Sequence, residues 1–227
     1  MEDIGLLFDS ISSRYDRFNH VASVGIDRMW RRDVVRSLPN CGKVLDVAAG
    51  TADLSIELLR KGKAVSVVGV DISEGMLDVG RRKVHKQGLD SSVQLLAADC
   101  AELPFGDNTF DAVVCAYGVR NFARLDLSLS EMYRVLKNGG ELRILEFSYP
   151  QNRIVRFFYD FYFTHVVPRI GKSITDNGDA YVYFMKSVKS FYKGHDFLSI
   201  LERNGFSNTS FMSQSFGISM LYLGCKR

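Results

Sequence analysis

The stretch that decides the fold reads Val44-Leu45-Asp46-Val47-Ala48-Ala49-Gly50-Thr51-Ala52-Asp53. Its apolar first half is typical of a buried strand, its small residues predict a tight turn, and residues 54–59 continue with helical spacing. A turn that binds a pyrophosphate needs the glycines of G-x-G-x-x-G, but alanines replace two of them here, and Asp46 and Asp53 flank the turn. The pattern favours a nucleoside cofactor with a positive charge and no phosphate, a description that fits S-adenosyl-L-methionine.

The composition is that of a soluble α/β protein, and we expect one domain over residues 1–227. Of these residues, 46% are hydrophobic and 24% are charged, and a net charge of +3 does not argue for a nucleic-acid partner. The four cysteines form no C-x-x-C pair and the four histidines lack metal-site spacing, so we expect a reducing compartment and no metal. The sequence shows neither a signal-peptide pattern nor a long apolar run, so we expect a cytoplasmic protein.

Strand-like and helix-like segments alternate after an N-terminal helical cap at residues 1–40, which predicts a mostly parallel, doubly wound sheet. We expect strands at 43–48, 66–71, 93–98, 110–116 and 140–147, and helices at 53–61, 74–87 and 125–136. The pair Gly139-Gly140 is predicted to stop the last of these helices. A helix at 195–204 and an antiparallel pair of strands at 209–213 and 218–225 complete a seven-stranded sheet.

Three acidic residues follow three successive strands of this predicted sheet. Asp46, Asp71 and Asp99 stand at the strand ends, and such ends line one edge of a parallel sheet. Asp71 is placed to bind ribose hydroxyls, and Asp99 to accept from an adenine amino group, while the backbone N–H of Cys100 contacts the ring. The alternative is that each Asp only caps a helix or forms a turn, but three at consecutive strand ends favour a cofactor site.

The loop after the fourth expected strand reads Ala116-Tyr117-Gly118-Val119-Arg120-Asn121. It should face the same cleft, where a methyl acceptor would meet the cofactor, and Arg120 and Asn121 are its best polar candidates. For Arg120 a surface salt bridge is an equally good interpretation.

The rhythm of strands and helices breaks over residues 149–193, which we expect to be irregular, aromatic and basic. Six of the seven residues 157–163 are aromatic. Three interpretations are open: a lid over an apolar substrate, a face that contacts an anionic membrane, or a helix that only packs on the sheet. Asp160, inside the aromatic run, argues against deep insertion into a membrane.

Two longer motifs carry a resemblance to a known family. The first is Tyr15-Asp16-Arg17-Phe18-Asn19 with Ser23, Gly25 and Trp30, and the second is Arg134-Val135-Leu136-Lys137-Asn138-Gly139-Gly140 with Leu142 and residues 145–148. Through these motifs and the loop 117–121, nearly the whole chain resembles the ubiquinone/menaquinone biosynthesis C-methyltransferases, a branch of the class I S-adenosylmethionine-dependent methyltransferases. The chain departs from the family at Asp27, commonly His, at Asn138, usually Pro, and at Ala116, where some members have Ser.

The resemblance implies a Rossmann-like class I methyltransferase fold in which Thr51, Asp71, Asp99 and Cys100 line the cofactor. The residues of the turn add Asp46 and Gly50 to this site. The implied reaction moves a methyl group to a ring carbon of a polyprenylated quinol. Arg120 and Asn121 are then expected to orient the ring and stabilise a developing phenolate, because arginine, with a pKa above about 12, is a poor base.

Among the quinols we favour demethylmenaquinol, in menaquinone biosynthesis. A 2-methoxy-6-polyprenyl-1,4-benzoquinol, in ubiquinone biosynthesis, and a small phenol remain open. The apolar tail of such a substrate implies peripheral contact with the inner face of the membrane. The oligomeric state stays open, a dimer included.

Other classes of protein share parts of these features. The turn of this chain lacks the second glycine that a nicotinamide oxidoreductase would have. A nucleic-acid methyltransferase would show Asn-Pro-Pro-aromatic or Pro-Cys after the fourth strand, where this chain has Ala116-Tyr117-Gly118. A non-catalytic scaffold that kept the cofactor fold is disfavoured because the three acids, Arg120 and Asn121 are all present.

Overall fold

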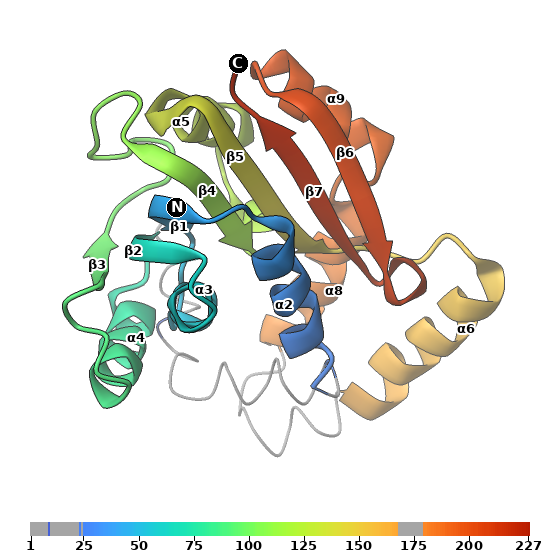
Figure 1. Ribbon diagram of the computed structural model, residues 1–227. Coiled ribbons are helices and arrows are strands. Elements are labelled where there is room, and N and C mark those ends of the chain that lie inside the picture. Colours follow the sequence, from blue (N-terminus) through green and yellow to red (C-terminus); the bar gives the residue numbers. More distant parts are fainter. Residues whose placement is uncertain (1–8, 10–22, 24, 168–178) are drawn as a thin grey trace.

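The computed structural model describes residues 9, 23, 25–167 and 179–227. Within them, a seven-stranded sheet has the order β3-β2-β1-β4-β5-β7-β6 (Figure 1). The strands are β1 (Cys41–Val47), β2 (Ala64–Asp71), β3 (Val93–Ala97), β4 (Phe110–Ala116), β5 (Leu136–Phe147), β6 (Ser207–Gln214) and β7 (Ser219–Cys225). The pairs from β3 to β5 are parallel and β7 is antiparallel to both β5 and β6, which confirms the predicted sheet.

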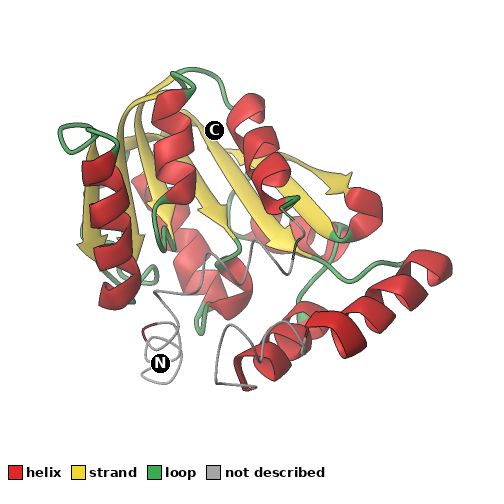
Figure 2. Cartoon of the chain, turned by 90° about the horizontal axis from the view of Figure 1, so that it is seen from below, coloured by secondary structure: helices red, strands yellow, loops and turns green. Residues whose placement is uncertain are grey.

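Helices cover both faces of the sheet (Figure 2). They are α2 (Asp27–Ser37), α3 (Asp53–Arg60), α4 (Glu74–Lys86), α5 (Leu125–Val135), α6 (Arg153–Phe161), α8 (Asp179–Ser190) and α9 (His195–Arg203), with a π-helical turn η2 (Tyr162–Val166) and the short 3-10 helices η1 (Val119–Asn121) and η3 (Ser215–Gly217). Trp30 of α2 shares a core with Val114 of β4, whereas Phe197 of α9 shares a second core with Val113. Successive strand residues point to opposite faces, so the central strands are apolar on both sides.

The glycine pair at 139–140 does not stop a helix, and this prediction is wrong. Helix α5 already ends at Val135, and β5 begins at Leu136. Leu136 pairs with Phe110, but the next pair is Glu141 with Ala112, so residues 137–140 form a bulge inside the strand. The backbone of Lys226 bonds both Gly139 N–H and the Gly140 carbonyl, which replaces the missing ladder bonds.

The described parts of the segment 149–193, residues 149–167 and 179–193, are mostly helical and not irregular, which corrects a second prediction. They contain α6, the turn η2 and α8. Tyr159 and Phe163 are buried, while Phe157, Phe158 and Phe161 are exposed. The apolar face of α6 points to solvent and not to the core, so the apolar pattern of the sequence does not show which side of the helix is buried.

The N-terminal helical prediction is confirmed for Asp27–Ser37, which forms α2. The rest of the predicted cap, with the motif at residues 15–19, lies outside the described residues apart from Asp9, Ser23, Gly25 and Ile26. None of the described helices is both long and apolar enough to cross a bilayer.

Candidate active site

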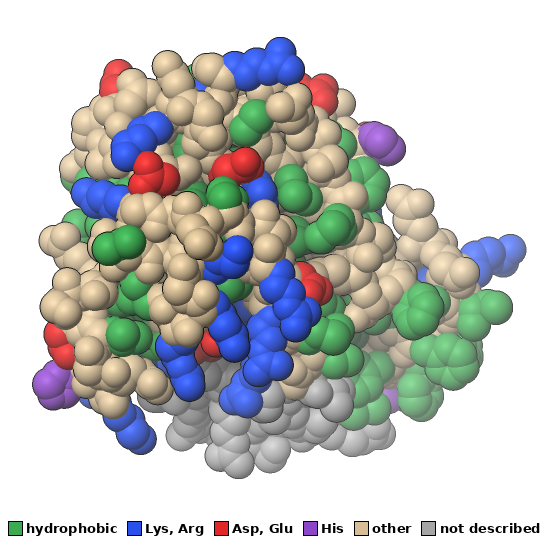
Figure 3. All heavy atoms as spheres, in the orientation of Figure 1, with side chains coloured by type: hydrophobic (Ala, Val, Ile, Leu, Met, Phe, Trp, Pro, Cys, Tyr) green, Lys and Arg blue, Asp and Glu red, His purple; other side chains and the backbone are tan. Residues whose placement is uncertain are grey.

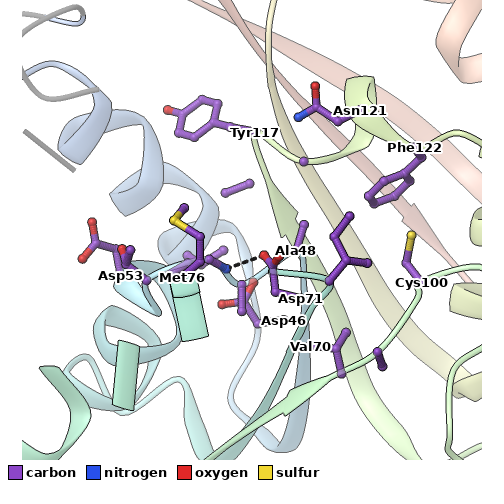
Figure 4. Close-up of a pocket in the computed structure, with 18 of the residues that line it drawn as sticks. Asp46, Ala48, Asp53, Val70, Asp71, Met76, Cys100, Tyr117, Asn121 and Phe122 are labelled. Atoms are coloured by element: carbon purple, nitrogen blue, oxygen red, sulfur yellow. Dashed lines mark hydrogen bonds between the residues drawn. The ribbon is translucent and has the colours of Figure 1, made fainter. Parts of the chain in front are cut away.

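A cavity opens at the carboxyl ends of β1, β2, β3 and β4, with α2 at its rim (Figure 4). About 1170 Å³ of space in and around it is not filled by atoms, a volume that includes open solvent. Lining side chains that carry polar atoms or sulfur are Asp27, Arg31, Asp46, Thr51, Asp53, Asp71, Met76, Asp99, Cys100, Tyr117 and Asn121. In parallel sheets this edge is where ligands bind.

The turn after β1 uses its backbone donors internally. The N–H of Ala49 donates to the Val70 carbonyl, that of Gly50 to the Asp71 carboxylate at 2.8 Å, and that of Ala52 to the Ala49 carbonyl. A pyrophosphate turn would instead direct such N–H groups at the ligand. The geometry therefore fits a cofactor without a phosphate at this position.

Close packing explains the small residues of the turn. Ala48, Gly50 and Ala52 adopt positive φ angles of 55°, 53° and 64°, at a cost of about 1–2 kcal/mol for each alanine. A Cβ added at Gly118, in the loop after β4, would lie 2.4 Å from the Cβ of Ala48. The turn after β1 and the loop after β4 are therefore in contact, and residues of both segments line the cavity.

Asp46 lies at the bottom of the site with 1% of its surface exposed. The Ser55 hydroxyl donates to its carboxylate at 2.6 Å. Burial raises the pKa of Asp46 to about 7, although the Ser55 hydrogen bond lowers it. Near neutral pH the carboxyl is therefore poised between its two forms, and a cation bound nearby would favour the ionised one.

Asp71 at the end of β2 is held by the backbone. Its two carboxylate oxygens accept from the N–H groups of Gly50, at 2.8 Å, and Ser73, at 2.9 Å. Burial raises the pKa of this carboxyl, while the backbone donors from Ser73 and Gly50 oppose the rise. These backbone donors fix the orientation of the carboxylate at the cavity, where its oxygens are acceptors for hydroxyl groups.

Asp99 and Cys100 line the far side of the cavity. Burial alone would raise the pKa of Asp99, but the N–H of Ala101 and the guanidinium of Arg124, 2.8 Å away, lower it. The Cys100 thiol donates to Ser128, and burial raises its pKa to about 11. Asp99 is therefore an acceptor at neutral pH, and Cys100 contributes a neutral wall instead of a nucleophile.

A charged cluster at the rim was not anticipated from the sequence. Asp53 accepts from Lys83 at 2.6 Å and pairs with Arg31 at 3.4 Å, and Lys83 also donates to Thr51. Arg31 forms a second ion pair with Asp27, the residue that stands where the family commonly has His. The signals in the sequence were only that Asp53 flanks the turn, that Asp27 departs from the family, and that Arg31 adjoins Trp30 of the first motif.

Arg120 lies beside the cavity and not in its lining. Its guanidinium donates to Glu146 at 2.7 Å and to the Tyr117 carbonyl at 2.5 Å, with 4% of the side chain exposed. It also lies over the rings of Phe147 and Phe184. The sequence left a surface salt bridge open for Arg120, whereas the structure shows a buried one that fixes the loop after β4.

Asn121 does reach the cavity, and helix α8 holds it there. The hydroxyl of Tyr183 donates to the Asn121 Oδ1 at 3.0 Å, and Ser187 of the same helix accepts from Arg120 at 3.3 Å. With Oδ1 engaged, the Nδ2 group is available as a hydrogen-bond donor to a ligand. The arrangement suits an oxygen that becomes negative during a reaction.

The cavity brings together nearly all of the predicted site residues. Asp46, Gly50, Thr51, Asp71, Asp99, Cys100 and Asn121 line it, and Arg120 stands behind its wall. Sequence reasoning did not assign Asp27, Arg31, Met76 and Phe122 to the site, because none of them directly follows a strand, and it included Tyr117 only as part of the loop after the fourth strand.

Comparison with known proteins agrees with this geometry. Residues 2–226 match the ubiE/COQ5 methyltransferase family. A demethylmenaquinone methyltransferase of Bacteroides fragilis is 41% identical, over 99% of this chain and 93% of that protein. A ubiquinone/menaquinone biosynthesis C-methyltransferase UbiE of Geobacter sulfurreducens is 42% identical, over 99% of this chain and 89% of that protein.

Solved structures share the fold at low sequence identity. A methyltransferase of Thermotoga maritima described as S-adenosylmethionine-dependent has a TM-score of 0.68 and 18% identity, and covers 97% of this chain and 98% of its own. The [4+2]-cyclase SpnF has a TM-score of 0.70 and 15% identity, over 98% and 95% of the two chains. A cyclase on this fold shows that the fold alone does not fix the chemistry. The full-length family match does, and this chain belongs to the ubiE/COQ5 methyltransferase family.

Proposed function

We propose that this protein transfers a methyl group from S-adenosyl-L-methionine to a ring carbon of a polyprenylated quinol, with demethylmenaquinol as its substrate. The observation that carries the proposal is one cavity in which the strand-end acids meet the loop containing Asn121. Relatives named for the methylation of demethylmenaquinone support this choice of acceptor. Relatives that carry the double ubiquinone/menaquinone name favour the methoxy-polyprenyl-benzoquinol as the second candidate.

The residues fit the cofactor by their chemistry. Asp71 offers two pre-oriented acceptors for ribose hydroxyls, Asp99 is an acceptor for an amino group, and Asp46 adds negative potential at the bottom of the site. When bound, the cofactor supplies an electrophilic methyl group on a sulfonium. Arg31, next to Asp53 at the rim, is the cation placed for a carboxylate.

The ring of the quinol is proposed to lie against Tyr117 and Phe122, within reach of Asn121. A ring carbon is a weak nucleophile until the neighbouring hydroxyl loses its proton. The Asn121 amide then donates to the phenolate oxygen that forms, and the proton leaves to water. Arg120 acts through its ion pair with Glu146, which holds the loop in place, and it does not take the proton itself.

Helix α8, within the described residues 179–193, is proposed to cover the acceptor side of the cavity. Tyr183 and Ser187 of α8 contact the loop that carries Asn121, so the helix and the loop form one unit. Because the tail of a polyprenylated quinol partitions into lipid, we propose that the protein works in the cytoplasm and collects its substrate at the inner face of the membrane.

The test is a methyl-transfer assay with radiolabelled S-adenosyl-L-methionine and two chemically reduced short-chain acceptors, a demethylmenaquinol and a methoxy-polyprenyl-benzoquinol. Label in the menaquinol product alone supports the proposal, and label in both products makes the enzyme common to two pathways. Label in the benzoquinol product alone refutes the choice of substrate. If neither product is labelled while the cofactor still binds, the quinol proposal fails. The Phe216→Ser variant, changed at an 83% exposed residue of η3, serves as an active control.

A further inference from the structure

Helix α6 carries a row of large apolar side chains that face solvent. Ile154, Phe157, Phe158 and Phe161 are 70%, 68%, 64% and 53% exposed, and they follow the spacing i, i+3, i+4, i+7 of one helix face. Their neighbour Tyr159, on the opposite side, is 4% exposed. These four residues are called the α6 apolar face below. Figure 3 shows hydrophobic side chains gathered in the region where α6 projects from the body. Soluble proteins keep such patches for partners or membranes.

Basic groups gather on another side of α6, around Tyr149. Arg156, Lys189 and Lys193 all lie about 5 Å from the ring of Tyr149, at 5.2, 5.0 and 5.2 Å. Asp160 accepts from the Tyr149 hydroxyl and pairs with Lys189, so one carboxylate stands against three cations. Burial, and then the charge of Arg156, lower the pKa of Lys193, a sign that the cations crowd one another. An anion placed here would relieve their repulsion.

We propose that the α6 apolar face enters the headgroup layer of a membrane while the three cations bind anionic phospholipid headgroups. An interfacial helix combines an apolar face with flanking basic residues in this way, and sinks about 5–10 Å into the lipid. Asp160 lies on the side of the cations, so it does not oppose such shallow docking. The inference rests on the proposed function in one respect, since a polyprenylated quinol resides in lipid.

The docked helix is linked to the active site by a chain of packed rings. Tyr159 contacts Phe163 at 4.4 Å between ring centroids, Phe163 contacts Phe184 at 5.8 Å, Phe184 contacts Phe147 at 5.1 Å, and Phe147 stacks on Tyr117 at 4.4 Å. Tyr117 lines the cavity. Docking of α6 would therefore place the acceptor side of the cavity at a fixed position relative to the lipid surface.

A second copy of the chain fits this surface less well. Four side chains of this size, exposed to this extent, offer roughly 500 Å², whereas a stable interface buries about 800 Å² on each partner. An anionic lipid surface meets both the apolar and the basic part of the site.

The test is flotation of the full chain with vesicles of phosphatidylcholine, or of phosphatidylcholine with about one third phosphatidylglycerol, in the absence of quinol. Wild-type protein should bind the anionic vesicles at least tenfold more tightly than the neutral ones. The F157S/F158S variant should lose at least tenfold of this binding, and K189Q/K193Q should lose the preference for anionic lipid. The control F216S removes an equally exposed phenylalanine and should bind as the wild type does.

Three results would overturn the proposal: no binding by the wild type, unchanged binding by F157S/F158S, or a dimer that light scattering shows to dissociate in F157S/F158S. Phe157, Phe158, Lys189 and Phe216 are exposed and Lys193 is half-buried, so thermal unfolding should stay within the wild-type range. Methyl transfer to a tail-less quinol in solution should also be unchanged in F157S/F158S. If neither the wild type nor any variant transfers a methyl group, the proposed function is refuted. The vesicle-binding result would still test the membrane proposal independently.

Discussion

Asp46 shows how burial turns an ordinary carboxyl into a pH-sensitive group. Its pKa in the folded protein is about 7, against an ordinary value of 3.8. Between these values the folded state keeps a proton that the unfolded state has released, so this residue makes the free energy of unfolding fall as the pH rises from about 4 to 7.

Asp46→Asn should remove that contribution, because the amide keeps an acceptor for Ser55 and does not titrate. Urea unfolding at pH 5 and pH 8 should show the variant gaining stability relative to the wild type as the pH rises. The same variant should bind S-adenosyl-L-methionine more weakly at pH 8. Parallel stability curves for the two proteins would contradict the raised pKa.

Tyr183 is a positioning residue for Asn121. Tyr183→Phe keeps the ring and removes the hydroxyl that fixes the amide, so turnover should fall about tenfold, as expected for one lost hydrogen bond. Affinity for the cofactor should not change, because Tyr183 is outside the cavity lining. The control is Tyr192→Phe, at an exposed tyrosine that follows the same helix. Equal turnover in the two variants would contradict the positioning role of Tyr183.

Arg120 is predicted to stabilise the fold and not to contact the substrate. Its partner Glu146 has a side chain that is only 1% exposed, and Arg120 supplies the opposite charge that this buried carboxylate needs. Arg120→Ala should lower the free energy of unfolding by about 3–5 kcal/mol, the usual effect of leaving a buried charge unpaired. Replacing both partners, as in R120L/E146L, should recover part of that loss. If Arg120→Ala lost activity at full stability, the guanidinium would have to contact the substrate directly.

At the scale of elements, the turn after β1 and the loop after β4 need small residues at the point where they are in contact. Gly118→Ala would place a Cβ 2.4 Å from that of Ala48, and backbone must move to relieve the clash. The variant should be less stable and bind the cofactor at least tenfold more weakly. Gly106→Ala is a matched control because its Cβ meets nothing closer than 3.8 Å. The double variant A48G/G118A should recover most of the loss, and failure to recover would place the defect elsewhere.

The elements also show what the sequence could predict. Alternating apolar segments located the strands and the acids at their ends, because these features are local in sequence and follow from strand period. The bulge at 137–140 and the buried pair of Arg120 with Glu146 depend on partners distant in the chain. Helix α6 escaped prediction for a different reason, since its apolar residues serve both the core and the exposed face.

At the scale of the whole molecule, three parts are joined by contacts that lead to one cavity. The sheet supplies the acids for the cofactor, α8 holds the loop with Asn121, and α6 presents an apolar face to solvent. Rings packed from Tyr159 to Tyr117 connect the exposed helix to the cavity wall. One side of the cavity is therefore proposed to bind the ring of a substrate that resides in lipid, and the other side to bind a nucleoside cofactor.

The most direct test of the central claim is to locate the transferred methyl group. The protein would be incubated with S-adenosyl-L-methionine carrying a ¹³C-methyl group and with reduced demethylmenaquinol, and the product examined by NMR. The account predicts a label on the ring carbon, at a rate reduced at least tenfold in Asn121→Ala with cofactor affinity retained. A label on a ring oxygen, or no labelled product from protein that binds the cofactor, would contradict it.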